Sequence, residues 1–179
     1  LPKHIDENKV LSRMDVSKDV DGFHVVNQGL LFQGKKAIYA ATPQGILNLL
    51  DAYNINVSGM NAVVVGRSNI VGMPIAKLLL DHNATVSICH SKTKDLKSYT
   101  LNADLLVVAI GKANFITSDM IKKNAIVIDV GINKVDGKLV GDVDFLNSVE
   151  VASYITPVPK GVGPMTINAL LENVFKIYA

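Results

Sequence analysis

From residue 62 onward, short apolar runs of strand length alternate with amphipathic stretches of helix length. Runs rich in Val, Ile and Leu without polar alternation are typical of parallel strands that are covered on both faces. Their alternation with helices predicts an α/β fold, with a Rossmann-type parallel sheet and helices on both faces. The predicted strands lie near 62–65, 84–89, 104–109 and 125–130, with a short fifth strand near 153–156.

Three crossover helices are expected between these strands, one over 74–82 and one that Ser118 would cap. A connecting helix is predicted to begin after Pro43, and a second amphipathic helix covers 163–179. The stretch before residue 40 has no partner strands of its own. We expect it to be helical over 7–14 and weakly extended over 29–40, as the end of another domain.

Charge and cysteine content narrow the class of protein. Lys and Arg number 18 against 16 Asp and Glu and are scattered, so no nucleic-acid footprint is predicted. No uninterrupted apolar run reaches the roughly 18 residues of a membrane span, and no metal site is predicted. Cys89 lies in an apolar run, so we expect a buried strand thiol in a reducing, cytoplasmic protein whose partner is a small molecule.

Gly66 follows the first predicted strand and precedes a helix. A glycine there lets backbone amides and the helix N-terminus approach a pyrophosphate, because a side chain would block the anion. The usual G-x-G-x-x-G spacing is altered to Gly66, Ser68 and Gly72, with one extra residue before the last glycine. The alternative is a glycine turn that only joins a strand to a helix.

The second strand ends in HSKT, residues 90–93. NAD-specific sites usually place a carboxylate there for the ribose 2′-hydroxyl, and this segment has none. Ser91 can donate to a 2′-phosphate, and Arg67 and Lys92 can neutralise it, so NADP is favoured over NAD. The alternative is that the two cations are solvated surface charges.

Two further strands also end in glycine, and a nicotinamide could lie along Ala109, Ile110, Gly111, Gly131 and Ile132. Acidic residues follow in the same region. Asp129 lies within a strand and is interpreted as a structural carboxylate bonded to backbone, whereas Asp142 and Asp144 are interpreted as helix caps.

Seven motifs then occur in the order found in one family: KDVDGFH, TPQG, GRSNIVGMP, CHSKT, MIKKNAIVIDVGIN, GDVDF and ITPVPKGVGPMT. Over essentially all 179 residues the chain resembles bifunctional methylenetetrahydrofolate dehydrogenase/methenyltetrahydrofolate cyclohydrolase, the FolD proteins. The resemblance implies NADP-dependent oxidation of 5,10-methylenetetrahydrofolate and hydrolysis of the product to 10-formyltetrahydrofolate, by a homodimer. It also implies a folate-binding catalytic domain that contributes 1–40, an NADP domain over 41–160, and a helix over 161–179 that returns to the catalytic domain.

The resemblance also assigns residues. Asp21 matches the pterin-binding aspartate, which we take as both a catalytic and a substrate-binding residue. The loop from Pro157 to Thr166 would line the meeting place of folate and nicotinamide. The remaining assignments are Gly66, Arg67 and Ser68 for the pyrophosphate and 2′-phosphate region, Ser91 for the adenosine side, Ile132 for the nicotinamide end, and Pro164 and Thr166 for the substrate.

Three departures from the family pattern carry expectations. The family's YxxxK tyrosine and lysine would precede residue 1, so the chain as given would bind NADP yet lack the lysine that steers proton transfer. Lys160 replaces a glycine of the loop, and a positive φ there would be strained. AATPQG lacks a family cysteine, which we expect to be neutral. The alternatives are a non-catalytic NADP-binding module and an NADP-linked dehydrogenase of a small hydroxy acid.

Overall fold

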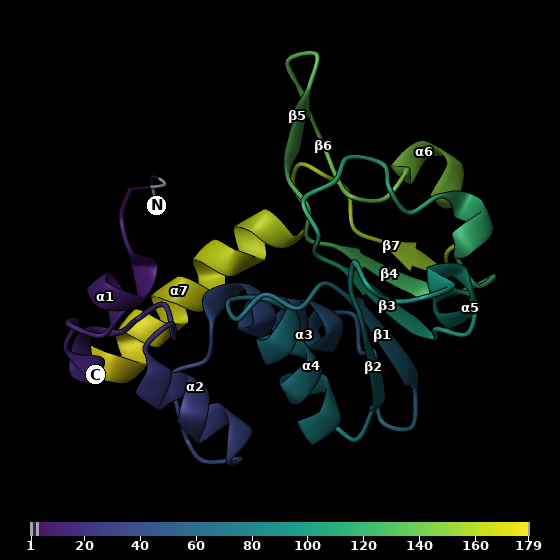
Figure 1. Ribbon diagram of the computed structural model, residues 1–179. Coiled ribbons are helices and arrows are strands. Elements are labelled where there is room, and N and C mark those ends of the chain that lie inside the picture. Colours follow the sequence, from purple (N-terminus) through teal and green to yellow (C-terminus); the bar gives the residue numbers. More distant parts are fainter. Residues whose placement is uncertain (1, 3, 179) are drawn as a thin grey trace.

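The computed structural model describes residues 2 and 4–178 (Figure 1). Five parallel strands form one sheet, and a two-stranded hairpin projects from it. The strands are β1 Asn61–Val65, β2 Thr85–Cys89, β3 Leu105–Val108, β4 Ile126–Asp129, β5 Asn133–Val135, β6 Lys138–Val140 and β7 Tyr154–Ile155. The helices are α1 Glu7–Leu11, α2 Val25–Phe32, α3 Ala41–Ala52, α4 Gly72–Asp81, α5 Leu96–Thr100, α6 Phe145–Ser148 and α7 Val162–Tyr178, with 3₁₀ turns at Val16–Lys18 and Ser118–Met120.

The predicted Rossmann-type sheet is confirmed, including its short fifth strand. The strand order is β2-β1-β3-β4-β7, so the chain leaves β1 for one edge and returns to the centre at β3. Such a reversal of direction opens a crevice at the carboxyl ends of the strands, where α/β proteins bind ligands. The fold therefore points to the turns after β1, β2 and β3.

Alternate residues of each central strand enter two separate cores. Val64 and Val107 pack on one face against α3 and α4, whereas Val65 and Val108 pack on the other face with Ile116 and Ile121. All six side chains are at most 3% exposed. Continuous burial on both faces explains why these strands lack polar alternation.

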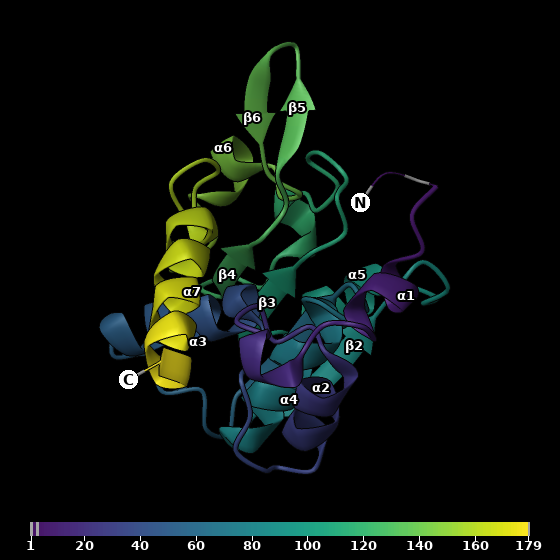
Figure 2. The same cartoon turned by 90° about the vertical axis from the view of Figure 1, so that its left-hand side faces the viewer.

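The long helix α7 crosses α3 beside the sheet (Figure 2). Gly45 allows the close approach, since a Cβ at that position would lie 2.6 Å from the Met165 carbonyl oxygen. The crossing is also bonded through Thr42 Oγ1 and Thr166 Oγ1, 3.0 Å apart, and through Asn48 Nδ2, which donates to Glu172. The helix predicted to begin after Pro43 begins two residues before it, at Ala41, which places Pro43 in the first turn.

The N-terminal segment differs most from expectation. The extended region predicted over 29–40 is wrong in its first part, because α2 covers Val25–Phe32. The buried Asp19 carboxylate accepts from the backbone N–H groups of Phe23 and His24 and from Asn27 Nδ2, so it organises the entry to this helix. The helix predicted over 7–14 ends early, at Leu11.

One other local prediction is wrong, and one element was not predicted. The third crossover is a single 3₁₀ turn at Ser118–Met120, with Thr117 at its N-cap position, so Ser118 caps no helix. The hairpin β5–β6 was not predicted, although Asp136 and Gly137 adopt the positive φ angles of 48° and 80° typical of a tight hairpin turn. Among the described residues, no helix combines the length and apolar character needed to cross a membrane.

Candidate functional site

Gly66 forms the turn between β1 and α4. Its φ of 130° is a conformation that L side chains rarely adopt, and its N–H donates to the Cys89 carbonyl oxygen at 2.9 Å. A Cβ there would overlap the Ala109 carbonyl oxygen, and a Cβ at Gly72 would overlap the Gly66 carbonyl oxygen. The two glycines thus bring the carboxyl ends of β1, β2 and β3 together with the start of α4.

Ser68 lies in the turn that leads into α4, four residues before its first residue, Gly72. Its Oγ accepts from the backbone N–H groups of Val71 and Gly72, at 3.2 and 3.3 Å. Ser68 lines a cavity that it shares with Phe23 and Val25 of the N-terminal segment, apart from the cavity beside Gly66. The structure therefore shows a capping role for Ser68, and contact with the cofactor stays a prediction.

A cavity of about 390 Å³ opens beside Gly66. Arg67 follows β1, Ser91 follows β2 and Lys112 follows β3, so three strand ends contribute to one wall. The lining residues, all in the described part of the chain, include no carboxylate. They are Val65, Gly66, Arg67, His90, Ser91, Thr93, Leu96, Ala109, Ile110, Lys112 and Phe115.

The structure brings together Arg67 and Ser91, as the sequence predicts, but not Lys92, which is exposed outside the cavity. The second strand-end cation of the cavity is Lys112, whose Nζ lies 5.2 Å from the centre of the Phe115 ring. The sequence analysis did not identify Lys112 or Phe115 as site residues. The signal that could have found Lys112 was its position directly after Gly111, the glycine at the end of the third strand.

The turn after β2 is held by its own side chains. The His90 N–H donates to Thr93 Oγ1 at 2.8 Å, and His90 Nδ1 accepts from the Lys92 N–H at 3.1 Å. His90 thereby faces the cavity, a role that sequence reasoning did not give it. Cys89 is the buried strand thiol that was predicted, and burial raises its pKa.

Ile132 and the acidic residues around it lie farther along the same edge of the sheet. Ile132 is 65% exposed and outside the cavity, so its nicotinamide contact stays a prediction. Asp129 accepts from the N–H groups of Gly131, Asp142 and Val143, which confirms a structural carboxylate, and burial raises its pKa to about 6.

The helix-cap interpretation is wrong for Asp142, whereas for Asp144 it is confirmed in position but not in side-chain bonding. Asp144 occupies the N-cap position of α6, but its side chain accepts from Asn147 Nδ2 rather than from the backbone. Asp142 caps no helix, since its buried carboxylate accepts from the backbone of residues 110–112.

Asp21 is exposed in a turn that the surrounding chain holds tightly. Gly22, at a φ of 70°, packs against the backbone of Tyr39, and Asn173 Nδ2 of α7 donates to the carbonyl oxygens of Val20 and Tyr39 at 2.9 Å each. Partial desolvation and the Asp19 carboxylate raise the pKa of Asp21. The turn presents a carboxylate without a hydrogen-bond partner among the described residues.

Pro164 and Thr166 lie in the first turns of α7. Thr166 is occupied by its contact with Thr42, and the exposed Pro164 borders a small cavity between α3, α7 and the β4–β7 edge. Lys160, in the loop before α7, has a φ of 80°, so the strained backbone expected at this position is confirmed. The substrate contacts of Pro164 and Thr166 stay predictions.

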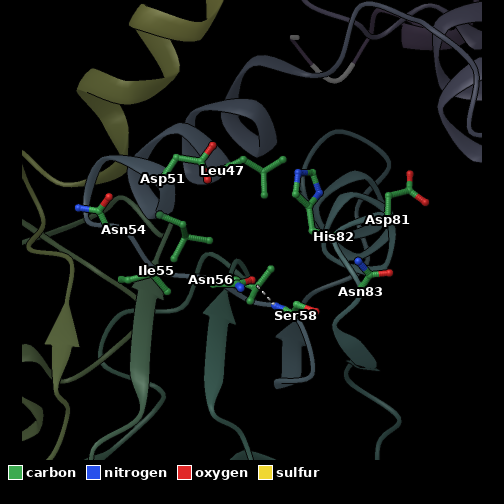
Figure 3. Close-up of a pocket in the computed structure, with 11 residues that line it drawn as sticks. Leu47, Asp51, Asn54, Ile55, Asn56, Ser58, Asp81, His82 and Asn83 are labelled. Carbon is green, nitrogen blue, oxygen red and sulfur yellow. Dashed lines mark hydrogen bonds between the residues drawn. The ribbon is translucent and has the colours of Figure 1, made fainter.

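A different cavity, of about 680 Å³, lies at the amino ends of β1 and β2 (Figure 3). Asp51 and Leu47 of α3 lie above it, and His82 borders it at the end of α4. Asn56 and Ser58 lie in the loop that leads into β1. Because parallel sheets bind ligands at the carboxyl ends of their strands, the cavity beside Gly66 is the candidate functional site.

Known proteins match nearly the whole chain in sequence. The bifunctional protein FolD of Acholeplasma laidlawii is 61% identical over 178 residues, which are 99% of this chain and 64% of that protein. FolD of a Nitratiruptor species is 60% identical over 176 residues, 98% of this chain and 62% of that protein. The chain thus spans a little under two thirds of the length of these relatives.

Solved structures agree closely. The FolD methylenetetrahydrofolate dehydrogenase/cyclohydrolase of Campylobacter jejuni superposes with a TM-score of 0.96 at 54% identity, over 99% of this chain and 64% of that one. The Trypanosoma brucei FolD, complexed with NADP cofactor and an inhibitor, gives 0.92 at 38% identity, over 99% of this chain and 63% of that one. The family model for the NAD(P)-binding domain of tetrahydrofolate dehydrogenase/cyclohydrolase matches residues 40–179. The chain therefore belongs to the tetrahydrofolate dehydrogenase/cyclohydrolase family and contains its NAD(P)-binding domain.

Proposed function

We propose that the complete protein oxidises 5,10-methylenetetrahydrofolate with NADP and hydrolyses the resulting methenyl cation to 10-formyltetrahydrofolate. The longer relatives that match 99% of this chain carry the name of that bifunctional enzyme. When bound, the oxidised nicotinamide would supply the acceptor for the hydride that leaves the methylene carbon. Water then adds to the cation, a proton is lost, and the bond from that carbon to one ring nitrogen breaks.

The observation that carries the proposal is the cationic cavity beside Gly66. Arg67, Ser91 and Lys112 line it, and no carboxylate does. A guanidinium and a hydroxyl match the oxygens of a phosphate, whereas a ribose 2′-hydroxyl would need a carboxylate acceptor. This donor set fits NADP, with Arg67 and Ser91 at the 2′-phosphate and the Gly66 turn near the pyrophosphate.

The folate side depends on Asp21. Its carboxylate would accept from the amino and ring N–H groups of a pterin, and the bonds around Val20 and Gly22 would hold it in place. In the full-length protein, Asp21→Ala should weaken folate binding by at least about tenfold, because a charged hydrogen bond is lost. Folate titration and an assay of methylenetetrahydrofolate oxidation would measure this loss.

Glu150→Ala, which removes an exposed carboxylate between α6 and β7, is the control and should leave folate affinity unchanged. Unchanged affinity in Asp21→Ala would remove the pterin assignment. A full-length protein that binds NADP but shows no oxidation of the folate would instead favour the alternative, a non-catalytic NADP-binding module.

We also propose that residues 1–40 and 161–179 belong to a catalytic domain and 41–160 to the NADP domain. The bonds from Asn173 to Val20 and Tyr39 support this division, because they tie α7 to the N-terminal segment.

One side of α7 exposes a stripe of large apolar residues. They are Ile167, Leu171, Val174, Phe175 and Tyr178, each between 37% and 72% exposed. We propose that the N-terminal part of the longer protein covers this stripe.

A homodimer is the oligomeric state that we propose, with β2 at its interface. β2 is an edge strand, so the backbone groups along its free side can pair with another strand. Phe32, Leu80 and Ile88 lie beside a groove at this edge and are 48%, 56% and 38% exposed. A cytoplasmic location stays a prediction.

Leu80→Asp should halve the mass of the full-length protein in light scattering, because a buried charge opposes association. Leu146→Asp is the matched control, since Leu146 is 81% exposed on α6, which precedes the opposite edge strand β7. A dimer that persists in Leu80→Asp, or that Leu146→Asp disrupts equally, would count against the β2 edge.

A further inference from the structure

Asp142 is fully buried near the carboxyl ends of the strands, and three of the four groups bonded to its carboxylate come from the loop after β3. Oδ2 accepts from the N–H groups of Ile110 and Gly111 at 2.7 and 2.9 Å. Oδ1 accepts from the Lys112 N–H at 2.8 Å and from Asn133 Nδ2 at 2.9 Å. One side chain thus fixes the loop after β3 and ties it to the start of the hairpin.

The loop held in this way borders the cofactor cavity. Ile110 and Lys112 line the cavity, and the Lys112 ammonium group lies over the Phe115 ring in the same wall. Three consecutive amides donate to one buried carboxylate, and hydrogen bonds to a charged acceptor are stronger than those to a neutral one, so this segment has little freedom. The place of the Lys112 charge in the cavity therefore depends on Asp142.

A second buried carboxylate holds the first in position. Asp129 Oδ1 accepts from the Asp142 N–H and Oδ2 from the Val143 N–H, both at 2.9 Å, and the Asp129 N–H donates to Thr156 Oγ1 at 2.8 Å. Thr156 precedes the loop that leads into α7. A chain of bonds therefore connects the loop before α7 with the cavity wall.

Two glycines make room for these carboxylates. A Cβ at Gly131 would overlap the Asp142 carboxylate, and a Cβ at Gly141 would overlap that of Asp129. Both glycines have φ values outside the positive range, so steric space rather than backbone conformation requires them. The buried carboxylates of Asp142 and Asp129 therefore depend on glycine at both of these positions.

We propose that Asp142 is a positioning residue for the cofactor: by holding the amides of residues 110–112, it sets the wall of the cavity that receives NADP. The inference rests on the proposed NADP site and adds to it a residue that touches no ligand. It predicts that loss of the carboxylate loosens cofactor binding while folate binding is retained.

The test is Asp142→Asn in the full-length protein, with Asp144→Asn as the matched control. The amide keeps the size of the side chain but replaces an acceptor oxygen with a donor, so at least one of the three backbone amides loses its acceptor. Asp144 lies two residues away, and its carboxylate bonds only Asn147 among the described residues. NADPH affinity is measured from nicotinamide fluorescence at a temperature where circular dichroism shows each variant folded.

We expect the NADPH dissociation constant and the KM for NADP to rise at least about tenfold in Asp142→Asn, with the KM for the folate unchanged. Asp144→Asn should match the wild type. A folded Asp142→Asn that binds NADPH as the wild type does would overturn the inference. A wild-type protein that binds no NADPH would overturn the proposed function instead.

Asn133→Ala covers the case in which Asp142→Asn fails to fold. It removes one of the four donors to Asp142 from a half-buried position and leaves the carboxylate in place. The NADPH dissociation constant should rise about threefold. An unchanged dissociation constant in this folded variant would also overturn the inference.

Discussion

Replacing Arg67 with alanine should weaken NADP binding by about 10- to 100-fold and change NAD binding by no more than about threefold. The guanidinium lies at the end of β1 in a cavity whose lining residues carry no carboxylate. Its bond to a doubly charged 2′-phosphate would be charge-assisted, and such bonds contribute about 1.5–3 kcal/mol. NAD lacks that phosphate, so in Arg67→Ala its binding loses only the general electrostatic attraction of the guanidinium.

Ser91→Ala should act in the same direction but less strongly, because a neutral hydroxyl donates a single bond. Lys92→Ala is the matched control: the side chain carries the same charge as Arg67 and is also exposed, but it does not line the cavity. Titration of each variant with NADPH and NADH would measure the ratio of the two affinities. Equal losses for both cofactors in Arg67→Ala would remove the case for a 2′-phosphate site.

Gly66→Ala should lower the free energy of unfolding by about 3 kcal/mol or more. Two costs add at this position. The φ of 130° is strained for any L side chain, and the new Cβ would overlap the Ala109 carbonyl oxygen. Ala109 directly follows the buried strand β3 and donates to the Val65 carbonyl oxygen, so it cannot move freely. In a chain of this size the loss corresponds to a drop in Tm of about 10 °C.

Gly137→Ala separates the two costs. Gly137 has a φ of 80° in the hairpin turn, but a Cβ there would meet no atom within 4 Å. Its substitution should cost only about 1 kcal/mol. Urea unfolding of the two variants would give the difference, and a Gly66→Ala variant no less stable than Gly137→Ala would mean that the contact with Ala109 does not constrain the turn.

Local pattern was sufficient wherever a residue's own neighbours determine its structure. The strands were predictable because β1, β3 and β4 are buried on both faces and carry uninterrupted Val, Ile and Leu. The Gly66 turn was predictable because only glycine tolerates that backbone, and the strain at Lys160 because the family has glycine there. Arg67 and Ser91 were predictable since strand ends of a parallel sheet meet at one edge.

The N-terminal segment shows what the local sequence pattern could not predict. Residues 29–40 have weak helical character by composition, and Gly29 and Gly34 favour an irregular chain. Helix α2 forms because the buried Asp19 carboxylate satisfies the N–H groups at its entry and because Leu31 packs into the core beneath α4. Those stabilising contacts involve other elements, which no window of sequence contains.

By itself, the sequence determined the layered α/β fold, the glycine turn and two of the charged or polar groups of the cofactor cavity, since each follows from strand burial or from backbone conformation. Only the tertiary structure decided which other cation joins them. It places Lys112 rather than Lys92 in the cavity, and it places Asp142 beside amides about 30 residues earlier in the chain. The physical reason is that a buried carboxylate is stable only when it is hydrogen-bonded, and its donors are the groups that the fold places beside it. Packing across the sheet, rather than proximity in sequence, determines which groups those are.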